Sequence, residues 1–485
     1  MLEKGIREMQ LSHDPAAVDA VFDEANLVSC AGLAPVLAMA EQAGLSELLV
    51  EQLTVPSPNA PVKVTALLAG MLAGADSIDD MDLLRHGAMD RLFTGARAPS
   101  TLGTFLRAFR FGQVRQLDAV AARLLAQLAV RTPLLPGGDR VAHVDIDDTV
   151  RATHGYAKQG AGFGYSGVSG LNALLGVVST PTAAPVIAAA RLRKGATNSA
   201  RGAARLVTDA LKAAAAAGAD PKAGSLVIAR MDSAFYGHDV IAAVRRARAR
   251  FSVTARMNPT VKAAIAGVQE DAWTAIHYPN AFVDPDTGEL VSDAEVAEVP
   301  TFTAFTSRRQ HEHVTARLIV RRVKRLNPNT LRGTVPEGQK ELFTTFDQWR
   351  YHAVFTDSPE AMLDAEATHR AHAVVEQVIA DLKNGPLAHL PSGVFTANAA
   401  WLALATIAFN LLRAAGALAA PGPGHGLAVA TTATLRARLV AVPARIARSA
   451  RRLTLHLPTR WPWQQEWAHL ANHTLGSTPA LPAAA

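Results

Sequence analysis

The stretch "VAHVDIDDTV", residues 141–150, places three carboxylates at the end of an apolar run that is typical of a buried strand. Asp145, Asp147 and Asp148 repel one another there, and a fold rarely accepts such a cluster without a cation to neutralise it. Two chemistries use this arrangement: metal-dependent phosphoryl transfer, and an aspartyl nucleophile in a phosphatase. The stretch predicts one of these two chemistries and leaves open which.

The residues around this stretch alternate between strand and helix patterns. Further strands are predicted up to Val178, in "SLVIARMDSAFYG" and in "FSVTARM", and helices in "NSARGAARLVTDALKAAAAAGAD" and "HDVIAAVRRARAR". Such alternation indicates an α/β fold. The second acid-terminated strand ends at Asp232, as the first ends at Asp147.

The segments outside this core have different textures, and we expect five regions. They are a helical N-terminal DNA-binding domain (1–135), the first part of the α/β core (136–257), a β-rich insertion (258–350), the last part of the core (351–420) and a basic C-terminal segment (421–485). In the first region, "APSTLGTFLRAFRFGQVRQLDAV" predicts one helix with Ser100 as N-cap. Arg107 and Arg110 on that helix are candidate phosphate contacts.

The composition narrows the class of protein. The chain has 485 residues, 49% of them hydrophobic, which predicts a globular fold with a large core. The single cysteine, Cys30, excludes a disulfide framework and a cysteine zinc cluster, and it suits a reducing compartment such as the cytoplasm. The charged N-terminus does not predict a secretory signal. Asn410 and Arg413 interrupt the apolar run 401–420, which favours a buried core helix over a membrane span.

The positive charge is concentrated locally. Seven arginines and one acid, Glu466, lie in 431–485, which accounts for the whole net charge of +6. A second basic cluster lies at 308–325, where the only acid is Glu312. Two such clusters suggest a polyanion partner, although a solvated basic face is the alternative. The candidate DNA contacts in them are Arg308, Arg309, Arg321, Arg322, Lys324, Arg445, Arg448, Arg451 and Arg452.

A helix predicted after Ser358-Pro359 and ending at Asn384-Gly385-Pro386 carries a polar stripe. At about 100° per residue, His369, His372, Glu376 and Lys383 fall on one face, beside an apolar face. Two carboxylates from strand ends and one from a helix can hold two Mg²⁺ ions, with Mn²⁺ as a substitute. We expect Asp147, Asp232 and Glu376 to be these ligands, with Asp145 as second choice for the first. A ribonuclease-H-like core supplies its acids from such a set of two strands and a helix.

The motifs "DIDDT", "RMDSAFYG" and "HRAHAVVEQVIADLKNGPLAHLPSG", in this order, resemble those of DDE transposases of bacterial insertion sequences. The resemblance is to the 1380 family of the insertion-sequence-4-like group, and it covers nearly the whole chain, including "GYSGVSGLNALL" and "VPARIARSARRLTLHLPTRWPW". The wider group has a motif of Tyr, two residues, Arg, three residues, Glu, six residues and Lys. Glu376 and Lys383 match it, whereas His369 replaces the Tyr and His372 the Arg.

The resemblance implies a function in DNA transposition. It implies binding of terminal inverted repeats, metal-dependent strand cleavage and transfer through a hairpin, and a homodimer in the DNA complex. It also implies phosphate contacts from Lys383 and from the positions of His369 and His372. The group's "D-x-T" pattern fits Asp147-Asp148-Thr149, which favours Asp147 as the first acid, and a β-strand insertion is implied between the second and third acids.

Other interpretations stay open. "VDIDDTV" also satisfies the D-x-D-x-T signature of haloacid-dehalogenase-type phosphatases, in which Asp145 would be the nucleophile and Asp147 the acid/base. A DNA-binding relative with an inactive core is a third class. Trp273 and Trp349, at the edges of the β-rich insertion, are candidates for stacking on a flipped base, and the alternative is that both are core tryptophans.

Overall fold

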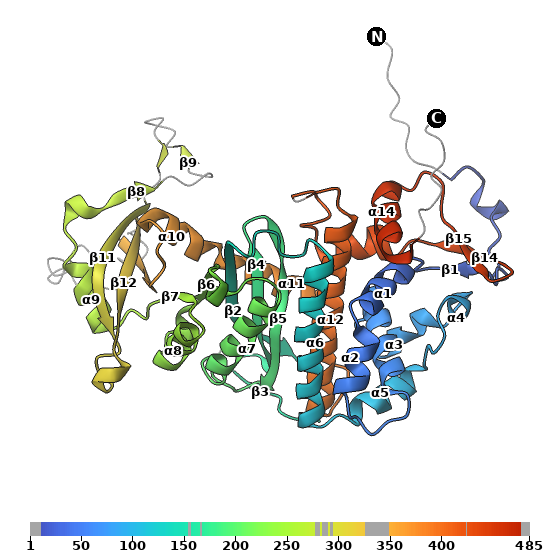
Figure 1. Ribbon diagram of the computed structural model, residues 1–485, viewed down its shortest axis with the longest axis horizontal. Coiled ribbons are helices and arrows are strands. Elements are labelled where there is room, and N and C mark those ends of the chain that lie inside the picture. The colour runs from blue at the N-terminus through green and yellow to red at the C-terminus, as the bar shows by residue number, and fades with distance from the viewer. Residues whose placement is uncertain are drawn as a thin grey trace, which may run out of the picture.

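The computed structural model describes residues 11–153, 157–164, 167–276, 282–283, 290–291, 294–324, 349–422 and 424–476. The molecule is elongated, with a β-rich end, a central α/β region and a helical end that contains both the N-terminal helices and the C-terminal segment (Figure 1). The fold is therefore α/β, as the alternating pattern predicts.

One mixed sheet runs through the centre and the β-rich end. Its central strands are β2 (Val141–Ala152), β4 (Ser169–Thr180), β5 (Ala183–Lys194), β6 (Leu226–Met231) and β7 (Arg250–Thr254). They lie in the order β5-β4-β2-β6-β7. Strands β2, β6 and β7 are parallel, whereas β4 is antiparallel to both β2 and β5. The sequence analysis did not identify β5 as a strand.

Helices cover both faces of these strands. Helix α7 (Ala203–Ala216) packs on the face of β2 and β4 that carries Ile146 and Gly176. Gly176 is required there, because a Cβ would lie 2.8 Å from the Cβ of Ala210. Successive side chains of a strand alternate between faces, so Asp145 and Asp147 lie on the opposite face. That face meets α10 (Met362–Arg370), a 3₁₀ turn (Ala371–Ala373) and α11 (Val374–Lys383).

The predicted single helix of 359–383 is wrong in one respect. The 3₁₀ turn at Ala371–Ala373 divides it into α10 and α11. Neither Gly nor Pro occurs in this turn, so the break arises from tertiary contacts described below. The angular relation between His369 and Glu376 that assumed one continuous helix therefore does not hold.

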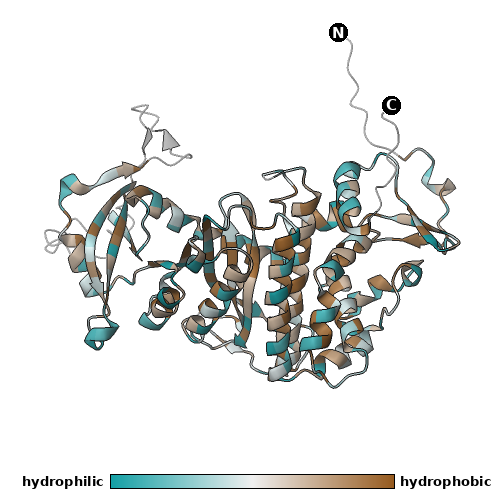
Figure 2. Cartoon of the chain, in the orientation of Figure 1, coloured by the Kyte–Doolittle hydropathy of each residue, from teal (hydrophilic) through white to brown (hydrophobic). Residues whose placement is uncertain are grey.

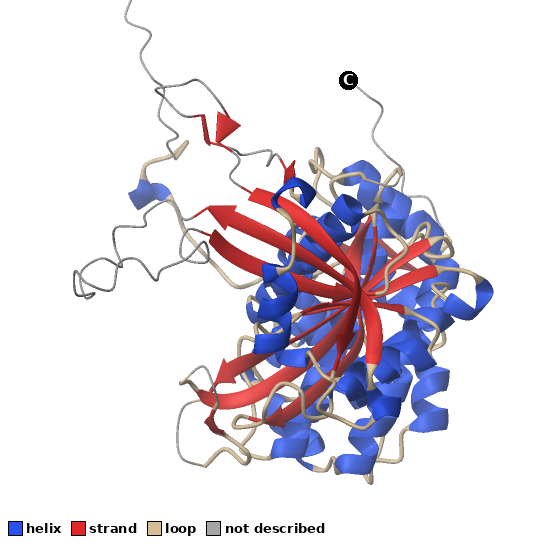
Figure 3. Ribbon diagram, turned by 90° about the vertical axis from the view of Figure 1, so that its left-hand side faces the viewer, coloured by secondary structure: helices blue, strands red, loops and turns tan. Residues whose placement is uncertain are grey.

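The β-rich region continues the central sheet. Strand β13 (Trp349–Thr356) pairs with β7, and the sheet extends through β12 (Val314–Lys324) and β11 (Ala294–Ala304) to β8 (Thr274–Ile276). A view along the sheet shows these strands fanning away from the central layer (Figure 3). Short strands β9 (Phe282–Val283) and β10 (Leu290–Val291) form a separate pair, and β3 (Gly162–Phe163) pairs with β4. Residues 325–348 of the expected β-rich insertion lie outside the described residues.

The N-terminal region is helical, as the sequence predicts. Its helices are α1 (Leu33–Gln42), α2 (Leu45–Gln52), α3 (Ala60–Ala73), α4 (Met89–Leu92), α5 (Pro99–Arg107) and α6 (Phe111–Arg131). The expected single helix around Ser100 is two helices, and the N-cap position of α5 is Ala98, without a side-chain cap. Buried Phe105 and Phe109 pack edge to face at 5.2 Å across the break.

The apolar run 401–420 belongs to α12 (Phe395–Ala419), which passes through the middle of the fold. Figure 2 shows it as one of the most hydrophobic helices. Among the described residues, α12 is a helix that is long enough and apolar enough to cross a membrane. However, 89% of its apolar window is buried inside the fold. The side-chain amide of Asn410 pairs with the backbone N–H and C=O of Ile187 in β5, so the polar residue in this helix has a structural role.

The C-terminal segment is a folded part of the helical end. It contains α13 (Thr432–Leu435), a π turn (Arg436–Val440), the β14–β15 ribbon (Ala444–Ser449 and Arg452–His456) and α14 (Gln464–Leu475). Strand β14 pairs with β1 (Leu27–Val28), and α14 packs on α1 and α12. Gly32 is held so close to this segment that a Cβ would lie 1.7 Å from the Leu439 carbonyl oxygen. The two ends of the chain therefore share one core.

Candidate active site

Two adjacent rows of side chains on β2 and β6 define the candidate site. The parallel register places Asp145 beside Arg230 and Ile146 beside Met231. Asp147 follows Ile146, and Asp232 follows Met231. The first row on this face is therefore an acid beside a base, and the following row is an acid beside an acid. A pair of acids at that point requires a cation or a proton.

Asp145 is fully engaged by protein groups. Its carboxylate accepts two hydrogen bonds from Arg230, both 2.7 Å, and lies 2.9 Å from Nδ1 of His372. Burial alone would raise the pKa of Asp145, but His372 and Arg230 more than offset it, so the pKa lies below its ordinary value. Asp145, the second choice for a metal ligand, is therefore buried and already holds hydrogen bonds from Arg230 and His372.

Asp148 is engaged on the other face of the strand. Its Oδ2 accepts a hydrogen bond from Asn172 at 2.9 Å and another from Arg193, whose guanidinium also donates to the carbonyl oxygens of Ser199 and Arg201. The three acids of the opening stretch are thus separated by their partners. Asp147 remains the one that faces Asp232.

The electrostatics of Asp147 and Asp232 reflect their proximity. Burial raises the pKa of Asp147 to about 6, and the charges of Asp232 and Asp148 act in the same direction. Burial and the charge of Asp148 also raise the pKa of Asp232, whose Oδ1 accepts a hydrogen bond from the Ala234 N–H. Both carboxylates are only partly buried, so a ligand can reach them from solvent. Two partly buried carboxylates with raised pKa values fit a hard divalent cation.

Two basic side chains face this pair of acids. His372 lowers the pKa of both Asp147 and Asp232 by its charge. Lys383, at the end of α11, is half-buried, and its pKa is lowered by burial and by Arg151, against the opposing charge of Asp147. The structure therefore brings together four residues that the sequence predicts for the site: Asp147, Asp232, His372 and Lys383.

Glu376 is placed differently. It lies in the first turn of α11 and is exposed. Lys383 follows it by seven residues, two turns along one helix face, so Glu376 is on the side of α11 that is turned toward Asp147. Within the described ranges, however, no group of three His, Cys, Asp or Glu side chains is arranged to hold a metal ion. Asp147 and Asp232 fit a metal site as they stand, whereas the Glu376 side chain does not yet join them.

His369 is not presented to a ligand. It is buried, with Nδ1 2.9 Å from the hydroxyl of Ser252 and Nε2 2.9 Å from that of Thr254. Burial lowers its pKa to about 3, so the ring is neutral. These contacts anchor the end of α10 to β7, and a DNA contact from His369 would require both hydrogen bonds to break.

The arginines of 308–325 are largely paired with acids, which corrects the expectation that Glu312 alone offsets them. Arg308 pairs with Glu312, Arg317 with Glu298, Arg321 with Glu366, and Arg322 with Glu295 and Glu270. Antiparallel pairing of β11 with β12 places Glu295 opposite Arg322, a contact invisible in a local charge count. Arg309 is exposed, and Lys324 is the last residue of β12.

Trp273 and Trp349 stack on an internal partner. The Arg322 guanidinium lies 4.2 Å from the ring centre of Trp273 and 4.6 Å from that of Trp349. Each ring is partly exposed, and Tyr351 lies beside Trp273. One face of each indole therefore meets a cation of the protein itself.

The remaining candidate DNA contacts lie at the helical end. Arg107 and Arg110 are exposed, and neither has an ion pair among the residues described. Arg445, Arg448, Arg451 and Arg452 are all exposed on the β14–β15 ribbon, and the ribbon sequence contains no acid.

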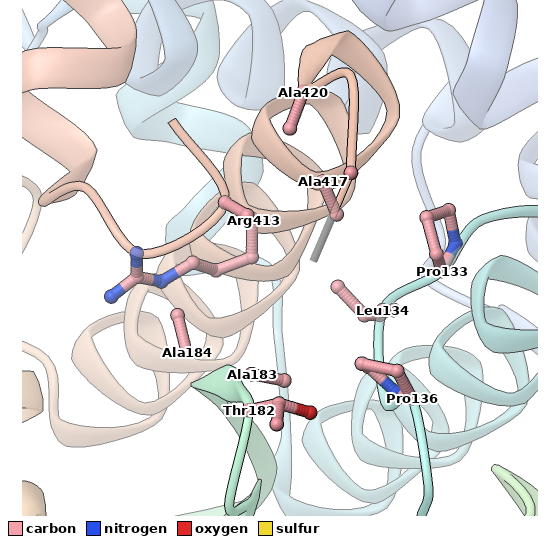
Figure 4. Close-up of a pocket in the computed structure, with 11 residues that line it drawn as sticks. Pro133, Leu134, Pro136, Thr182, Ala183, Ala184, Arg413, Ala417 and Ala420 are labelled. Carbon is pink, nitrogen blue, oxygen red and sulfur yellow. The ribbon is translucent and has the colours of Figure 1, made fainter. Parts of the chain in front are cut away.

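The cavities of the fold lie elsewhere. One of about 50 Å³ is lined by Leu134, Pro136, Ala417 and their neighbours, and the guanidinium of Arg413 points away from it (Figure 4). A larger groove of about 440 Å³ lies between α6, β5 and α7. Neither is lined by Asp147, Asp232 or Glu376.

The fold and the acid pair define an α/β protein with two partly buried carboxylates of raised pKa on neighbouring parallel strands. A sequence model of the family described as "Transposase DDE domain group 1" matches residues 12–474. The chain belongs to this family of transposition enzymes, which generally use divalent metal ions. No curated protein matches the chain.

Proposed function

We propose that this protein is a DNA transposase of the 1380 family of insertion sequences, which binds its terminal inverted repeats and catalyses metal-dependent strand cleavage and transfer. The observation that carries the proposal is the row formed by Asp147 and Asp232, two acids in adjacent positions beside a neutralised row. Cut-and-paste transfer through a hairpin, a homodimer on DNA and a cytoplasmic location are parts of the same proposal, and rest on the family resemblance.

The strand order supports a ribonuclease-H-like core. Strands β5, β4 and β2 form an antiparallel meander, and β6 and β7 continue it in parallel after β2 through helical crossovers. In such a core, an acid on the first strand meets an acid at the end of the fourth. These strands are β2, which carries Asp147 within it, and β6, which Asp232 follows. The helix that supplies the third acid is then α11.

Each residue has a proposed role. Asp147, Asp232 and Glu376 would hold two divalent ions, and Mg²⁺ would supply activation of the attacking hydroxyl and stabilisation of the leaving oxygen. Lys383 lies beside the acids as a point charge for a DNA phosphate. His372 orients its ring through Asp145, which leaves its other nitrogen available on the side of the acids.

The phosphatase alternative is disfavoured by Asp145. Its nucleophile would have to attack a phosphate, but this carboxylate is buried and accepts hydrogen bonds from Arg230 and His372. An inactive DNA-binding relative differs in one measurable respect. Purified protein with Mg²⁺ and DNA carrying the flanking inverted repeats should give strand cuts, and binding without cuts would identify the inactive relative.

The β14–β15 ribbon is the best candidate surface for the DNA backbone. Four exposed arginines lie on a two-stranded ribbon without an acid, and the ribbon is anchored to the core by β1. Phosphate contacts of this kind carry little sequence information. Deletion of 431–485 is not a clean test, because α14 and the π turn belong to the core.

We expect replacement of Arg445, Arg448, Arg451 and Arg452 by Ala to weaken binding to end DNA and unrelated DNA alike. If each arginine neutralises one phosphate, the slope of log affinity against log salt should become shallower by about 3 to 4 on duplex DNA. Fluorescence anisotropy over a KCl series measures this slope.

A matched variant controls for net charge. Four exposed cations on other surfaces can be replaced instead, namely Arg123, Arg131, Lys212 and Lys222. This variant should retain most of the wild-type slope. An equal loss in both variants would show that general charge, and not the ribbon, determines binding.

The Trp273–Arg322–Trp349 stack gives a separate expectation. Trp349→Ala removes one aromatic partner of a buried guanidinium, worth about 2 kcal/mol when desolvated, in addition to lost packing. We expect a lower melting temperature and a parallel decrease in nicking, hairpin formation and hairpin opening. A variant that folds and nicks normally but fails at the hairpin would instead assign base stacking to Trp349, and Trp273→Ala provides the same comparison for the second ring.

A further inference from the structure

Arg230 connects three elements around the candidate site. Its Nε and Nη2 donate to the two carboxylate oxygens of Asp145 on β2, and its Nη1 donates to the carbonyl oxygen of Thr368 at 2.7 Å. Thr368 lies in the last turn of α10. The side chains of Asp145 and Arg230 are 0% and 3% exposed, so both are held in a dry environment.

His372 adds a second connection to the same carboxylate. Its Nδ1 lies 2.9 Å from Oδ1 of Asp145, and because a carboxylate can only accept, this nitrogen carries the proton. His372 is the middle residue of the 3₁₀ turn that separates α10 from α11. Two contacts therefore hold the helix break in place. Arg230 binds the residue Thr368 before the break, and His372 within the break binds Asp145.

We propose that Asp145, Arg230 and His372 form a positioning network, which fixes the start of α11 against β2 and so directs Glu376 and Lys383 toward Asp147 and Asp232. This inference rests on the proposed function. It extends that function to Asp145 and Arg230, which have no proposed contact with the metal or with a DNA phosphate. A buried ion pair is a poor source of stability compared with apolar side chains of similar size. Directional hydrogen bonds to a backbone carbonyl and to a ring nitrogen provide what apolar packing lacks, a defined position for the helix.

The test separates positioning from stability with two sets of variants. Asp145→Leu with Arg230→Met replaces the buried pair by apolar side chains, a change that is often neutral for folding. His372→Leu removes the hydrogen bond from the ring to Asp145 and the action of the ring on the nearby acids, and it leaves the Asp145–Arg230 ion pair intact. His372→Asn is the conservative variant, because its amide nitrogen can donate from nearly the position of Nδ1.

Binding of Mn²⁺ to the DNA-free protein is the main readout, measured from the paramagnetic resonance of unbound Mn²⁺. We expect the double variant and His372→Leu to keep their melting temperature but to lose about 10–100-fold in Mn²⁺ affinity, as when groups that orient metal ligands are removed. His372→Asn should recover most of this affinity. The nicking rate should fall in the same order. The DNA affinity of the double variant should stay near that of the wild type, because neither Asp145 nor Arg230 is a proposed DNA contact.

A matched pair on the opposite face serves as control. Asp148→Leu with Arg193→Met removes a buried ion pair from the same strand. This variant should lose much less Mn²⁺ affinity than the double variant, because it removes the Asp148 charge near the acids but leaves the position of α11 unchanged. The proposal is overturned if the double variant and His372→Leu bind Mn²⁺ and nick DNA as the wild type does, or if the control loses as much. If the double variant does not fold, the His372→Leu and His372→Asn pair decides alone. If the wild type and Asp147→Ala bind Mn²⁺ equally, the proposed function itself fails.

Discussion

Asp147→Ala, Asp232→Ala and Glu376→Ala should each abolish metal-dependent strand cleavage and leave DNA binding near the wild-type level. Removing one carboxylate from a metal site that activates a hydroxyl and stabilises a leaving oxygen costs several kcal/mol of transition-state stabilisation, which corresponds to at least about 10³-fold in rate. Nicking of an end-containing duplex in Mg²⁺ measures the rate, and anisotropy in Ca²⁺ or without metal measures binding.

The stability of these variants gives an independent check. The pKa of Asp147 is raised to about 6 by burial and by Asp232, so the folded state binds its proton more tightly than the unfolded state does. Ionisation of Asp147 therefore destabilises the folded state relative to the unfolded state. This cost is absent below about pH 4, grows as the pH rises, and is complete above about pH 6. Metal-free Asp147→Asn should accordingly melt higher than the wild type at pH 7.5 and at nearly the same temperature at pH 4.

Individual outcomes would revise the assignment. If Glu376→Ala cleaves at the wild-type rate, the third acid lies elsewhere, since the exposed Glu376 would then have no part in the site. If Asp145→Asn abolishes cleavage with Mn²⁺ binding unchanged, Asp145 takes part in the chemistry and not in positioning. Lower melting temperatures for Asp147→Asn at pH 7.5 would mean that Asp147 is a structural residue.

The strands of the core were predictable where apolar runs end in acids. Strands β2 and β6 were predicted in this way, although β2 continues past its acids to Ala152, and β7 and helix α7 were predicted from their apolar patterns alone. Strand β5 was not predictable, because "AAPVIAAARLRK" is rich in Ala, a residue that favours helices and is depleted in strands. Its pairing with β4 and the clamp of Asn410 on Ile187 are tertiary contacts that no local pattern reveals.

The candidate site was predictable in part for the same reason. Asp232 directly follows β6, whereas Asp147 lies within β2, and the sequence alone left the choice between Asp145 and Asp147 open. "DID" and "RMD" have the same spacing, so parallel strands that pair Asp145 with Arg230 leave Asp147 beside Asp232. The helix break at His372 was not predictable, because it depends on Arg230 capturing the Thr368 carbonyl and on Asp145 binding the ring.

Charge counts along the chain agree with the charge exposed after folding for one cluster of arginines but not for the other. The arginines of β14 and β15 have no acid on their own ribbon, and they stay exposed after folding. Those of β12 meet Glu295 and Glu298 on the neighbouring strand, and Glu366 on α10. A basic run on a central strand is therefore weak evidence for a nucleic-acid surface, whereas one on an edge ribbon is stronger.

The last of the three opening acids should have the largest effect on stability. Asp148 is buried, and its carboxylate neutralises the buried guanidinium of Arg193 with help from Asn172. Asp148→Ala removes the buried carboxylate with which this guanidinium pairs, at a cost of about 3–5 kcal/mol. We expect a melting temperature several degrees below that of the wild type at pH 7.5, measured by calorimetry.

The partner substitutions distinguish a lost charge from lost packing. Arg193 also donates to the carbonyl oxygens of Ser199 and Arg201, which lead into α7, so Arg193→Ala should be as harmful as Asp148→Ala. Asp148→Leu combined with Arg193→Met removes both charges together and should recover most of the melting temperature, because no buried charge is then left alone. If the combined variant is as unstable as the sum of the single ones, the network stabilises the fold through its hydrogen bonds to the 199–201 loop, and the charge on Asp148 is secondary. Either result would still separate Asp148 from Asp147, whose replacement should raise stability at the same pH.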